Sequence, residues 1–383
     1  MRVLHTIRSL NPETGGPIEA LRQIAAVNMR DGHHIEVASL DAPDAPWLKN
    51  FPLPCHALGP GRGSYGYTPR LVPWLRERAD AGAYDAVIAH GLWQYNSFGV
   101  WRALARTGAG RRTIPYFAFP HGMLDPWFKR RYPLKHLKKW LYWPWGDYRV
   151  LRDARATLFT SEEERRLASQ SFPLYHANER VVHYGTSAPP PTDASAFRKE
   201  FPETIGKRCV LFLGRVHEKK GVDLLLRAFA AELVEPWHLI IAGPHDNEYG
   251  QAMRALAQEL GIGHRVTWTG MLSGEAKWGA FRSAEVFMLP SHQENFGIAV
   301  AEALGCGVPV LISDKVNIWR EIVGDRAGFA EPDDLAGARR LLARWADTPA
   351  DERAAMKKCA SDCFAARFDV EQNARKFIEV LSE

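Results

Sequence analysis

The sequence predicts an α/β fold with two doubly wound domains, each a parallel sheet covered by helices on both faces. Short apolar strands alternate with amphipathic helices twice along the chain, and 383 residues exceed one compact core. A Pro-rich segment, residues 188–192, stands where the charge balance changes. Residues 1–190 carry 25 Lys and Arg against 16 Asp and Glu, and the remainder carries 24 against 28. Opposite net charges favour two domains with different partners.

The elements follow from hydrophobic patterning. Helical stretches at residues 18–30, 222–232, 251–260 and 335–346 separate the expected strands. Apolar strands interleaved with helices are typical of parallel sheets, whose ligands bind beyond the carboxyl ends of the strands. The expected strands are residues 3–7, 35–40, 86–89, 116–119 and 157–160, then 209–213, 238–242, 266–269, 286–289 and 308–312.

These elements divide the chain into an N-terminal domain at residues 1–187 and a second domain at residues 188–367. Residues 368–383 are compatible with a last helix that packs back on the first domain. We expect a cleft between the two domains.

Composition indicates a globular cytoplasmic protein. Apolar residues make up 46% and charged residues 24% of the chain. The first seven residues lack the apolar stretch of a signal peptide. Five cysteines without a paired framework suit a reducing compartment. Cys359 and Cys363 are four positions apart with no nearby His, which argues against a zinc site.

Two carboxylates, Glu294 and Glu302, lie eight positions apart beyond the expected strand at residues 286–289. Asn295 is expected to cap a helix over residues 296–304, which Gly305 and Gly307 end. The first N–H groups of that helix are unpaired and suit a diphosphate, while carboxylates accept hydrogen bonds from sugar hydroxyls. The pattern favours a sugar-nucleotide site; two surface glutamates beside a turn are the alternative.

Two cations follow the expected strand at residues 209–213. Arg215 leaves the strand end, and Lys220 with Gly221 opens the next helix. Cations beside a helix N-terminus can neutralise a diphosphate without a metal ion. A solvated basic turn is the alternative. Near the N-terminus, Gly15 and Gly16 permit close backbone approach to a phosphate, or form a simple turn.

Two histidines follow expected strands directly. His121 comes after residues 116–119 with Gly122 beside it, and His90-Gly91 repeats the arrangement after residues 86–89. The carboxyl end of a strand is where a ligand would meet them. Structural histidines are the alternative for both, and His121 is the stronger functional candidate.

Residues 128–145 hold six Lys or Arg, six aromatic residues and no acidic residue. Basic residues mixed with Trp and Tyr favour a helix at an anionic membrane surface. Cover for the core and nucleic-acid binding are the alternatives, and we expect no nucleic acid as partner. The candidate membrane contacts are Lys129, Arg130, Arg131, Lys135, Lys138, Lys139 and Trp140.

Taken together, these residues resemble the retaining GT-B glycosyltransferases of glycosyltransferase family 4. The resemblance covers nearly the whole chain and is strongest over residues 209–310. It implies two Rossmann-like domains facing a central cleft, an acceptor-binding N-terminal half and a donor-binding C-terminal half. It also implies no cofactor and no metal, which agrees with the absence of an Asp-x-Asp motif from the sequence.

Site roles follow from the same resemblance. Arg215 and Lys220 would hold the donor diphosphate, Glu294 the hydroxyls of the transferred sugar, and Glu302 the ribose. The catalytic candidates are thus His121, Arg215, Lys220 and Glu294. Further donor contacts implied are Gly15, Gly16, Gly243, Met271, Leu272, Asn295, Phe296, Gly297 and Ile298. Many members carry Pro-Asn-Gly-Val-Asp where residues 183–187 here read His-Tyr-Gly-Thr-Ser, which leaves the hinge geometry open.

The resemblance implies transfer of a hexose from a GDP- or UDP-linked sugar to a hydroxyl acceptor with retention. The basic aromatic segment favours a polyprenyl-linked saccharide, hence bacterial surface or extracellular polysaccharide synthesis at the inner face of the membrane. A sugar-nucleotide epimerase or hydrolase, and an inactive nucleotide-binding scaffold subunit, are the alternatives. Donor conversion without acceptor would favour the former, and nucleotide binding without turnover the latter. The sequence does not indicate the oligomeric state.

Overall fold

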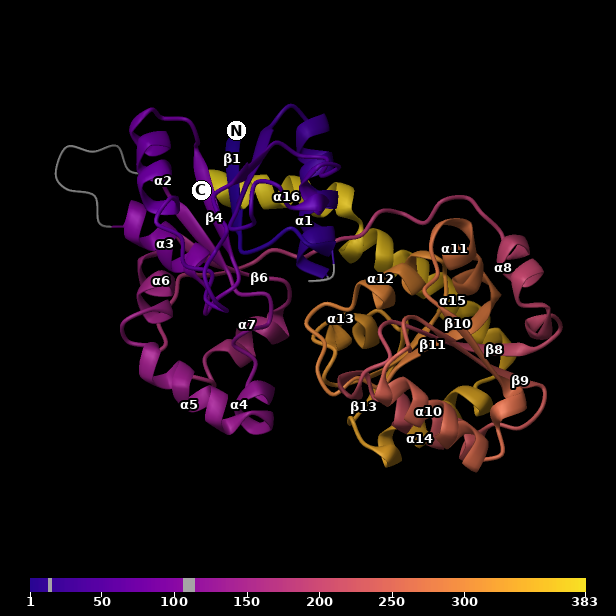
Figure 1. The fold of residues 1–383 in the computed structure, drawn as a ribbon. Coiled ribbons are helices and arrows are strands. Elements are labelled where there is room, and N and C mark those ends of the chain that lie inside the picture. The colour runs from indigo at the N-terminus through magenta and orange to yellow at the C-terminus, as the bar shows by residue number, and fades with distance from the viewer. Residues whose placement is uncertain (13–15, 106–113) are drawn as a thin grey trace. The chain divides into compact units, whose positions relative to one another are not determined.

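The computed structural model describes residues 1–12, 16–105 and 114–383. The chain forms two compact units (Figure 1), a first unit of Met1–Gly185 with Val370–Glu383 and a second unit of Thr186–Asp369. Each unit holds one sheet in which the paired strands are parallel, so the expected α/β fold is confirmed. The chain passes from the first unit to the second two residues earlier than the sequence indicated, and the last helix belongs to the first unit.

The sheet of the first unit has seven strands in the order β3-β2-β1-β4-β5-β6-β7. Chain order reverses between β1 and β4, which makes their carboxyl ends a switch point where doubly wound sheets bind ligands. The sequence did not reveal β3 and β7, which are three residues long and too short for a pattern. The strands are β1 (Arg2–Ile7), β2 (His34–Ser39), β3 (Cys55–Ala57), β4 (Ala86–His90), β5 (Tyr116–Phe119), β6 (Ala156–Phe159) and β7 (Glu179–Val181).

Helices cover this sheet, and α16 from the far end of the chain lies beside α1 (Figure 1). Phe377 of α16 is buried and stacks on His5, with ring centroids 6.3 Å apart. Arg375 pairs with Asp31 at 2.9 Å. The helices are α1 (Gly16–Arg30), α2 (Leu71–Asp80), α3 (Tyr95–Leu104), α4 (Trp127–Arg131), α5 (Pro133–Tyr142), α6 (Asp147–Asp153), α7 (Glu162–Ala168) and α16 (Val370–Ser382).

The sheet of the second unit has six strands in the order β10-β9-β8-β11-β12-β13, with the reversal between β8 and β11. Its strands are β8 (Arg208–Leu213), β9 (Trp237–Ala242), β10 (Val266–Gly270), β11 (Ala284–Leu289), β12 (Val310–Ser313) and β13 (Gly328–Glu331). Its helices are α8 (Ser195–Glu200), α9 (Val222–Glu232), α10 (Glu248–Glu259), α11 (Gly274–Ser283), α12 (Ile298–Gly305), α13 (Trp319–Gly324), α14 (Leu335–Asp347) and α15 (Ala350–Cys363).

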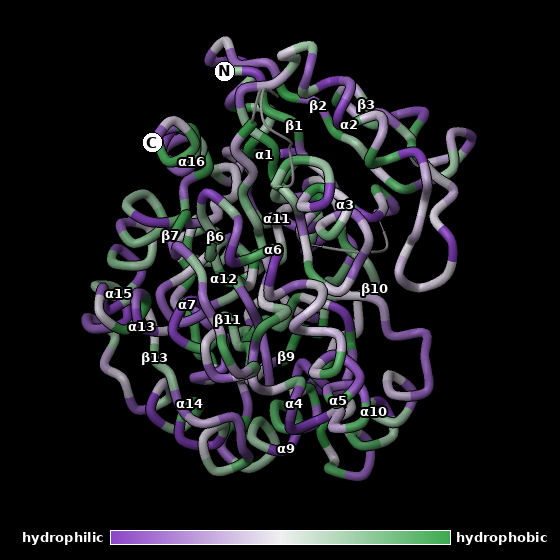
Figure 2. The backbone as a smooth tube through the Cα atoms, turned by 90° about the vertical axis from the view of Figure 1, so that its left-hand side faces the viewer, coloured by the Kyte–Doolittle hydropathy of each residue, from purple (hydrophilic) through white to green (hydrophobic). Residues whose placement is uncertain are grey.

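The strands form the core of each unit. Hydrophobic residues dominate them in Figure 2, and Val210, Leu211 and Phe212 of β8 are fully buried. A strand buried on both faces cannot shift its register without exposing apolar side chains. The loops that leave its carboxyl end therefore start from fixed positions.

Phe377→Ala should weaken the attachment of α16 to the first unit. Removing a buried aromatic ring typically costs about 3–5 kcal/mol of unfolding free energy. Hydrogen exchange of the α16 amide groups should show this loss. The control is Lys376→Ala, which changes an exposed residue of the same helix and should cost less than about 0.5 kcal/mol. Equal loss of protection in both variants would contradict the packing described.

Candidate functional site

The site lies in the second unit, where loops leave the carboxyl ends of β8, β9 and β10. A Cβ at Gly243 would stand 1.9 Å from the carbonyl oxygen of Gly214, so only glycine permits this approach. The Gly243 N–H donates to the Gly270 oxygen at 2.7 Å, and the Gly214 N–H donates to the Ala242 oxygen at 2.8 Å. These bonds hold the three loops side by side.

The turn between β8 and α9 is fastened to the loop that follows β11. Gly221 has a φ of +66°, and a Cβ there would stand 2.1 Å from the carbonyl oxygen of Pro290. The Ser291 hydroxyl and the His292 N–H each donate to the Lys219 oxygen at 2.8 Å. Lys220 is thereby fixed beside the second loop.

Lys220 forms an ion pair with Glu294, and both side chains are mostly buried. The Glu294 N–H donates to the Lys315 oxygen at 2.9 Å, and its own carbonyl oxygen accepts from the Asn317 N–H at 3.0 Å. Burial raises the pKa of Glu294, but the charge of Lys220 and its hydrogen bond outweigh burial and bring that pKa below its ordinary value. The pair therefore presents a carboxylate and an ammonium group together.

The expected helix cap at Asn295 is wrong. Helix α12 begins at Ile298, and its N-cap is Gly297 with a φ of +76°. Glu294 bridges to Val316 as in a parallel sheet, and Asn317 Nδ2 donates to Asn295 Oδ1 at 3.4 Å. Backbone pairing here keeps Asn295 away from the helix. The first N–H groups of α12, starting at Ile298, have no partner inside the helix.

Phe296 lies between these elements and is buried against Phe368, with ring centroids 5.7 Å apart. Its side chain therefore anchors the loop, and only its backbone remains as a possible ligand contact.

Glu302 lies on α12 and is almost completely buried. Lys277 of α11 donates to Glu302 Oε1 at 2.6 Å. Sequence reasoning missed Lys277, because nothing in the pattern connects a lysine on one helix with a glutamate on the next. The pair places an ammonium group in direct contact with a second buried carboxyl group of this unit.

The remaining predicted donor contacts occupy the same edge of the sheet. Arg215 follows β8 and is exposed, and Met271 and Leu272 follow β10. The structure thus brings Arg215, Lys220, Gly243 and Glu294 to one edge of the second unit.

His121 belongs to the first unit and lies in a chain of hydrogen-bonded rings. Its Nε2 lies 2.7 Å from His90 Nδ1, and its Nδ1 lies 2.7 Å from the Tyr184 hydroxyl. His90 Nε2 lies 2.8 Å from His5 Nδ1. The sequence singled out His90 and His121, but missed His5 and Tyr184. His5 lies inside β1, in register with Ile88 of β4, so no pattern along the chain indicates its contact with His90.

The three histidines are neutral at ordinary pH. Burial lowers the pKa of His5 and of His121 to about 3, and lowers that of His90 well below its usual range. A neutral imidazole offers one donor and one acceptor, so the direction of one hydrogen bond sets the others in the chain. His121 is thus suited to a fixed orientation and not to proton transfer.

Two other predicted groups belong to the first unit. Gly16 is the exposed first residue of α1, whereas Gly15 lies outside the described residues. The basic aromatic segment forms α4 and α5, where the structure places the candidate membrane contacts Lys129, Arg130, Arg131, Lys135, Lys138, Lys139 and Trp140.

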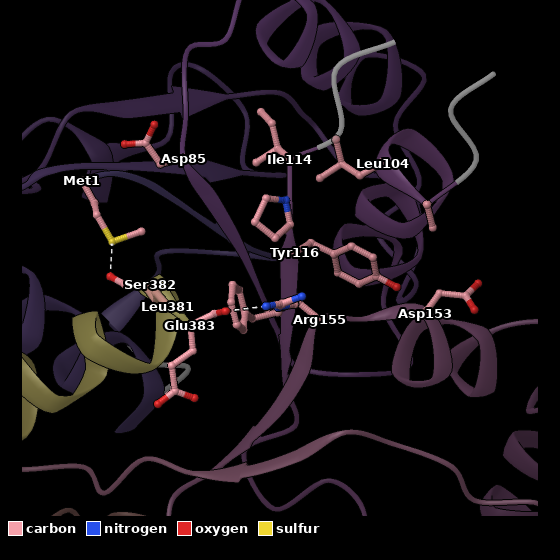
Figure 3. Close-up of a pocket in the computed structure, with 13 residues that line it drawn as sticks. Met1, Asp85, Leu104, Ile114, Tyr116, Asp153, Arg155, Leu381, Ser382 and Glu383 are labelled. Carbon is pink, nitrogen blue, oxygen red and sulfur yellow. Dashed lines mark hydrogen bonds between the residues drawn. The ribbon is translucent and has the colours of Figure 1, made fainter. Parts of the chain in front are cut away.

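A cavity of about 770 Å³ in the first unit (Figure 3) does not lie at the carboxyl ends of the strands. Met1, Asp85 and Arg155 line it, and they precede β1, β4 and β6. It therefore lies at the amino ends of the strands, opposite the edge where doubly wound sheets bind ligands.

Two properties of the described residues concern metal ions and membranes. Residues 1–12, 16–105 and 114–383 contain no group of three or more His, Cys, Asp or Glu placed to hold a metal ion. In those ranges no helix has both the length and the apolar character needed to cross a membrane.

Lys220→Met should raise the pKa of Glu294 and so reverse the effect of its ionisation on the stability of the fold. In the wild type the lowered pKa means that the ionised carboxylate stabilises the fold above its ordinary pKa, and this stability is lost as pH falls. Without the ammonium group, burial is opposed only by the charge of Lys219 and the backbone N–H of Asn295, and the pKa of Glu294 should rise above 4.5, its ordinary value. A carboxyl ¹³C NMR titration measures it, with Lys207→Met as control; an unchanged pKa would disprove the pairing.

Comparison with known proteins places both units in one family. Residues 15–185 match the model described as "Glycosyl transferase 4-like domain", and residues 193–361 match "Glycosyl transferases group 1". A D-inositol 3-phosphate glycosyltransferase of Mycobacteroides abscessus is 30% identical over 194 residues, and one of Mycolicibacterium smegmatis is 32% identical over 234 residues. These regions are 49% and 58% of this chain, but only 43% and 51% of the relatives. The chain thus spans about half their length.

Solved structures agree on the fold. The Anabaena protein HepE, in complex with UDP and glucose, aligns with a TM-score of 0.76 at 19% identity over 100% of this chain and 99% of its own. Sucrose-phosphate synthase from Thermosynechococcus elongatus aligns with a TM-score of 0.75 at 20% identity over 99% and 98%. With two family models matched along nearly its whole length and this fold, the chain belongs to the GT-B glycosyltransferases of the family 4 type.

Proposed function

We propose that this protein transfers a hexose from a nucleoside-diphosphate sugar to a hydroxyl acceptor with retention at the anomeric carbon. The observation that carries the proposal is the fixed Lys220–Glu294 pair at the carboxyl edge of the second sheet. It combines a cation for a diphosphate with an acceptor for sugar hydroxyls.

Lys220 can bind the Glu294 carboxylate and a phosphate group at the same time. An ammonium group has three N–H donors, so Lys220 can keep Glu294 and still donate to a phosphate oxygen. Arg215 is exposed at the same edge and offers a bidentate guanidinium. The N–H groups of Ile298 and Ala299 at the start of α12 add a partial positive charge, whereas those of Val300 and Ala301 donate to the Gly297 oxygen. Together these groups would stabilise a departing diphosphate without a metal ion.

In the proposed reaction the bond between the anomeric carbon and the diphosphate oxygen breaks, and the acceptor oxygen bonds to that carbon from the same face. The acceptor proton passes to the leaving phosphate oxygen. No carboxylate has to act as a covalent nucleophile. Glu294 would bind the hydroxyls of the transferred sugar and Glu302, held by Lys277, would bind the ribose. His121, the predicted histidine near the donor sugar, is bonded at both ring nitrogens and would have to release His90 or Tyr184 to contact that sugar.

The nucleotide and acceptor are part of the proposal. The proposed donor carries GDP or UDP, and the complexes of HepE with UDP and with UDP-glucose support a nucleoside diphosphate. Gly243, Met271 and Leu272 would border the base. The acceptor proposed is a lipid-linked saccharide in polysaccharide synthesis at a membrane surface. The curated relatives act on D-inositol 3-phosphate by name, and this compound belongs in the acceptor panel.

Arg215→Ala and Lys220→Ala should each lower turnover by at least about a hundredfold, as loss of one preorganised donor does elsewhere. Product formation from UDP- and GDP-hexoses over the acceptor panel measures it, with Lys207→Ala as a control outside the site. The anomeric configuration of the product, read by NMR, should match that of the donor. Near-normal rates in either variant, or donor conversion that needs no acceptor, would refute the proposal.

The outer surface of α5 should govern membrane binding. Co-sedimentation with phosphatidylglycerol vesicles should be strong for the wild type and about tenfold weaker for Lys138→Glu, since each basic residue contributes about 1 kcal/mol at an anionic surface. Val234→Glu is the control, because Val234 is exposed in the second unit. Absence of wild-type binding, or equal binding of Lys138→Glu, would exclude the membrane role.

A further inference from the structure

Helix α5 turns its apolar face away from the core of the first unit, unlike an ordinary surface helix. Leu134, Leu137 and Leu141 recur at helical spacing, and their exposed fractions are 78%, 55% and 61%. Trp140 and Trp145 are also exposed. A helix on a water-soluble surface normally turns such a stripe toward the core. The outer face of α5 is therefore suited to an apolar phase, and Figure 1 shows α4 and α5 at one end of the first unit, beyond its sheet.

The inner face of α5 is polar and lines a cavity of about 230 Å³. The cavity is smaller than the roughly 300–1,000 Å³ of sites that enclose a whole small molecule. A group of several heavy atoms, such as a phosphate or diphosphate, fits this size. The residues that line it are Met123, Asp125, Phe128, Tyr132, Lys135, His136, Lys139, Ser171 and Phe172.

Aromatic rings hold the two ammonium groups of this cavity. Lys139 Nζ lies 4.8 Å from the centroid of Trp93 and 5.7 Å from that of Phe128. Lys135 Nζ lies 4.9 Å from the centroid of Tyr132. In the described part of the chain, no carboxylate comes within 4.0 Å of either ammonium group. Neither cation thus has a carboxylate in direct contact, although Lys139 also feels the charge of the more distant Asp147.

The lining of the cavity sets one carboxyl group, that of Asp125, against these two ammonium groups. Asp125 Oδ1 accepts a hydrogen bond from the Trp127 N–H at 2.8 Å, as at the start of a helix. His136 adds a neutral donor, because burial and the neighbouring lysines Lys129 and Lys139 lower its pKa. The cavity therefore has a net positive charge and several hydrogen-bond donors.

We propose that the cavity beneath α5 binds the phosphate or diphosphate of a lipid-linked acceptor, while Leu134, Leu137 and Leu141 lie in the membrane that carries the lipid. The inference rests on the proposed transferase function and names the chemistry of its acceptor. One helix then meets both parts of such a lipid, with ammonium groups on one face and leucines on the other.

Calorimetric titration of the full chain with geranyl diphosphate, a soluble probe with an apolar chain and a diphosphate, tests the site. Lys139→Gln and Lys135→Gln should each weaken binding about tenfold, as expected for a lost charged hydrogen bond. Lys376→Gln is the matched control, because it removes an exposed lysine of α16 in the same unit, and it should bind like the wild type. Lys139→Arg keeps the charge and should retain binding, which separates loss of charge from loss of folding.

Two further probes identify the ligand. Inorganic pyrophosphate and geraniol should both bind more weakly than geranyl diphosphate, because each lacks one of its two parts. Equal binding of either probe, or equal weakening by Lys376→Gln, would overturn the inference. UDP titration reports separately on the second unit. If UDP binds and geranyl diphosphate does not, the acceptor site is wrong and the donor site remains.

Discussion

The ion pair between Lys220 and Glu294 is the interaction on which the proposed chemistry depends. Neither partner would be stable there alone, because a buried charge without its counter-charge is costly. The pair exists because Gly221 lets the β8–α9 turn press against Pro290, and because Lys219 accepts hydrogen bonds from the loop after β11. One glycine-dependent contact and two hydrogen bonds thus place a cation and a carboxylate at the switch point of one sheet.

The two units differ in how they position their polar and charged side chains. The second unit fixes charge with short loops tied to buried strands, which suits a ligand of defined geometry. In the first unit, neutral histidines are aligned in a buried chain, and a peripheral helix carries cations on one side and leucines on the other. A soluble nucleotide and a lipid-borne acceptor would require this difference.

The regular elements and the main motif could be predicted from the sequence because both are local. Three strands were not predicted: β3 and β7 have three residues each, and β13 begins with a glycine and has only two buried residues. The position of Glu294 after β11 followed from chain order. The cap at Asn295 could not be excluded, because its backbone pairs with residues 316–317, which are far away in sequence.

Contacts between side chains that are distant in sequence were the second feature that could not be predicted. Lys277 reaches Glu302 from another helix, and His5 reaches His90 from another strand. No spacing along the chain indicates either contact. The orientation of α5 could not be predicted either, since the composition of residues 128–145 fits an outward or an inward apolar face.

The most direct measurement is the affinity that the diphosphate adds to nucleoside binding. Titration calorimetry would compare UDP with uridine, and GDP with guanosine, in the wild type and in the double variant Arg215→Ala/Lys220→Ala. If fixed positive charge at this edge holds the diphosphate, the preference for the diphosphate over the nucleoside should fall at least about tenfold in the variant, while nucleoside affinity stays the same. An unchanged preference would contradict the account.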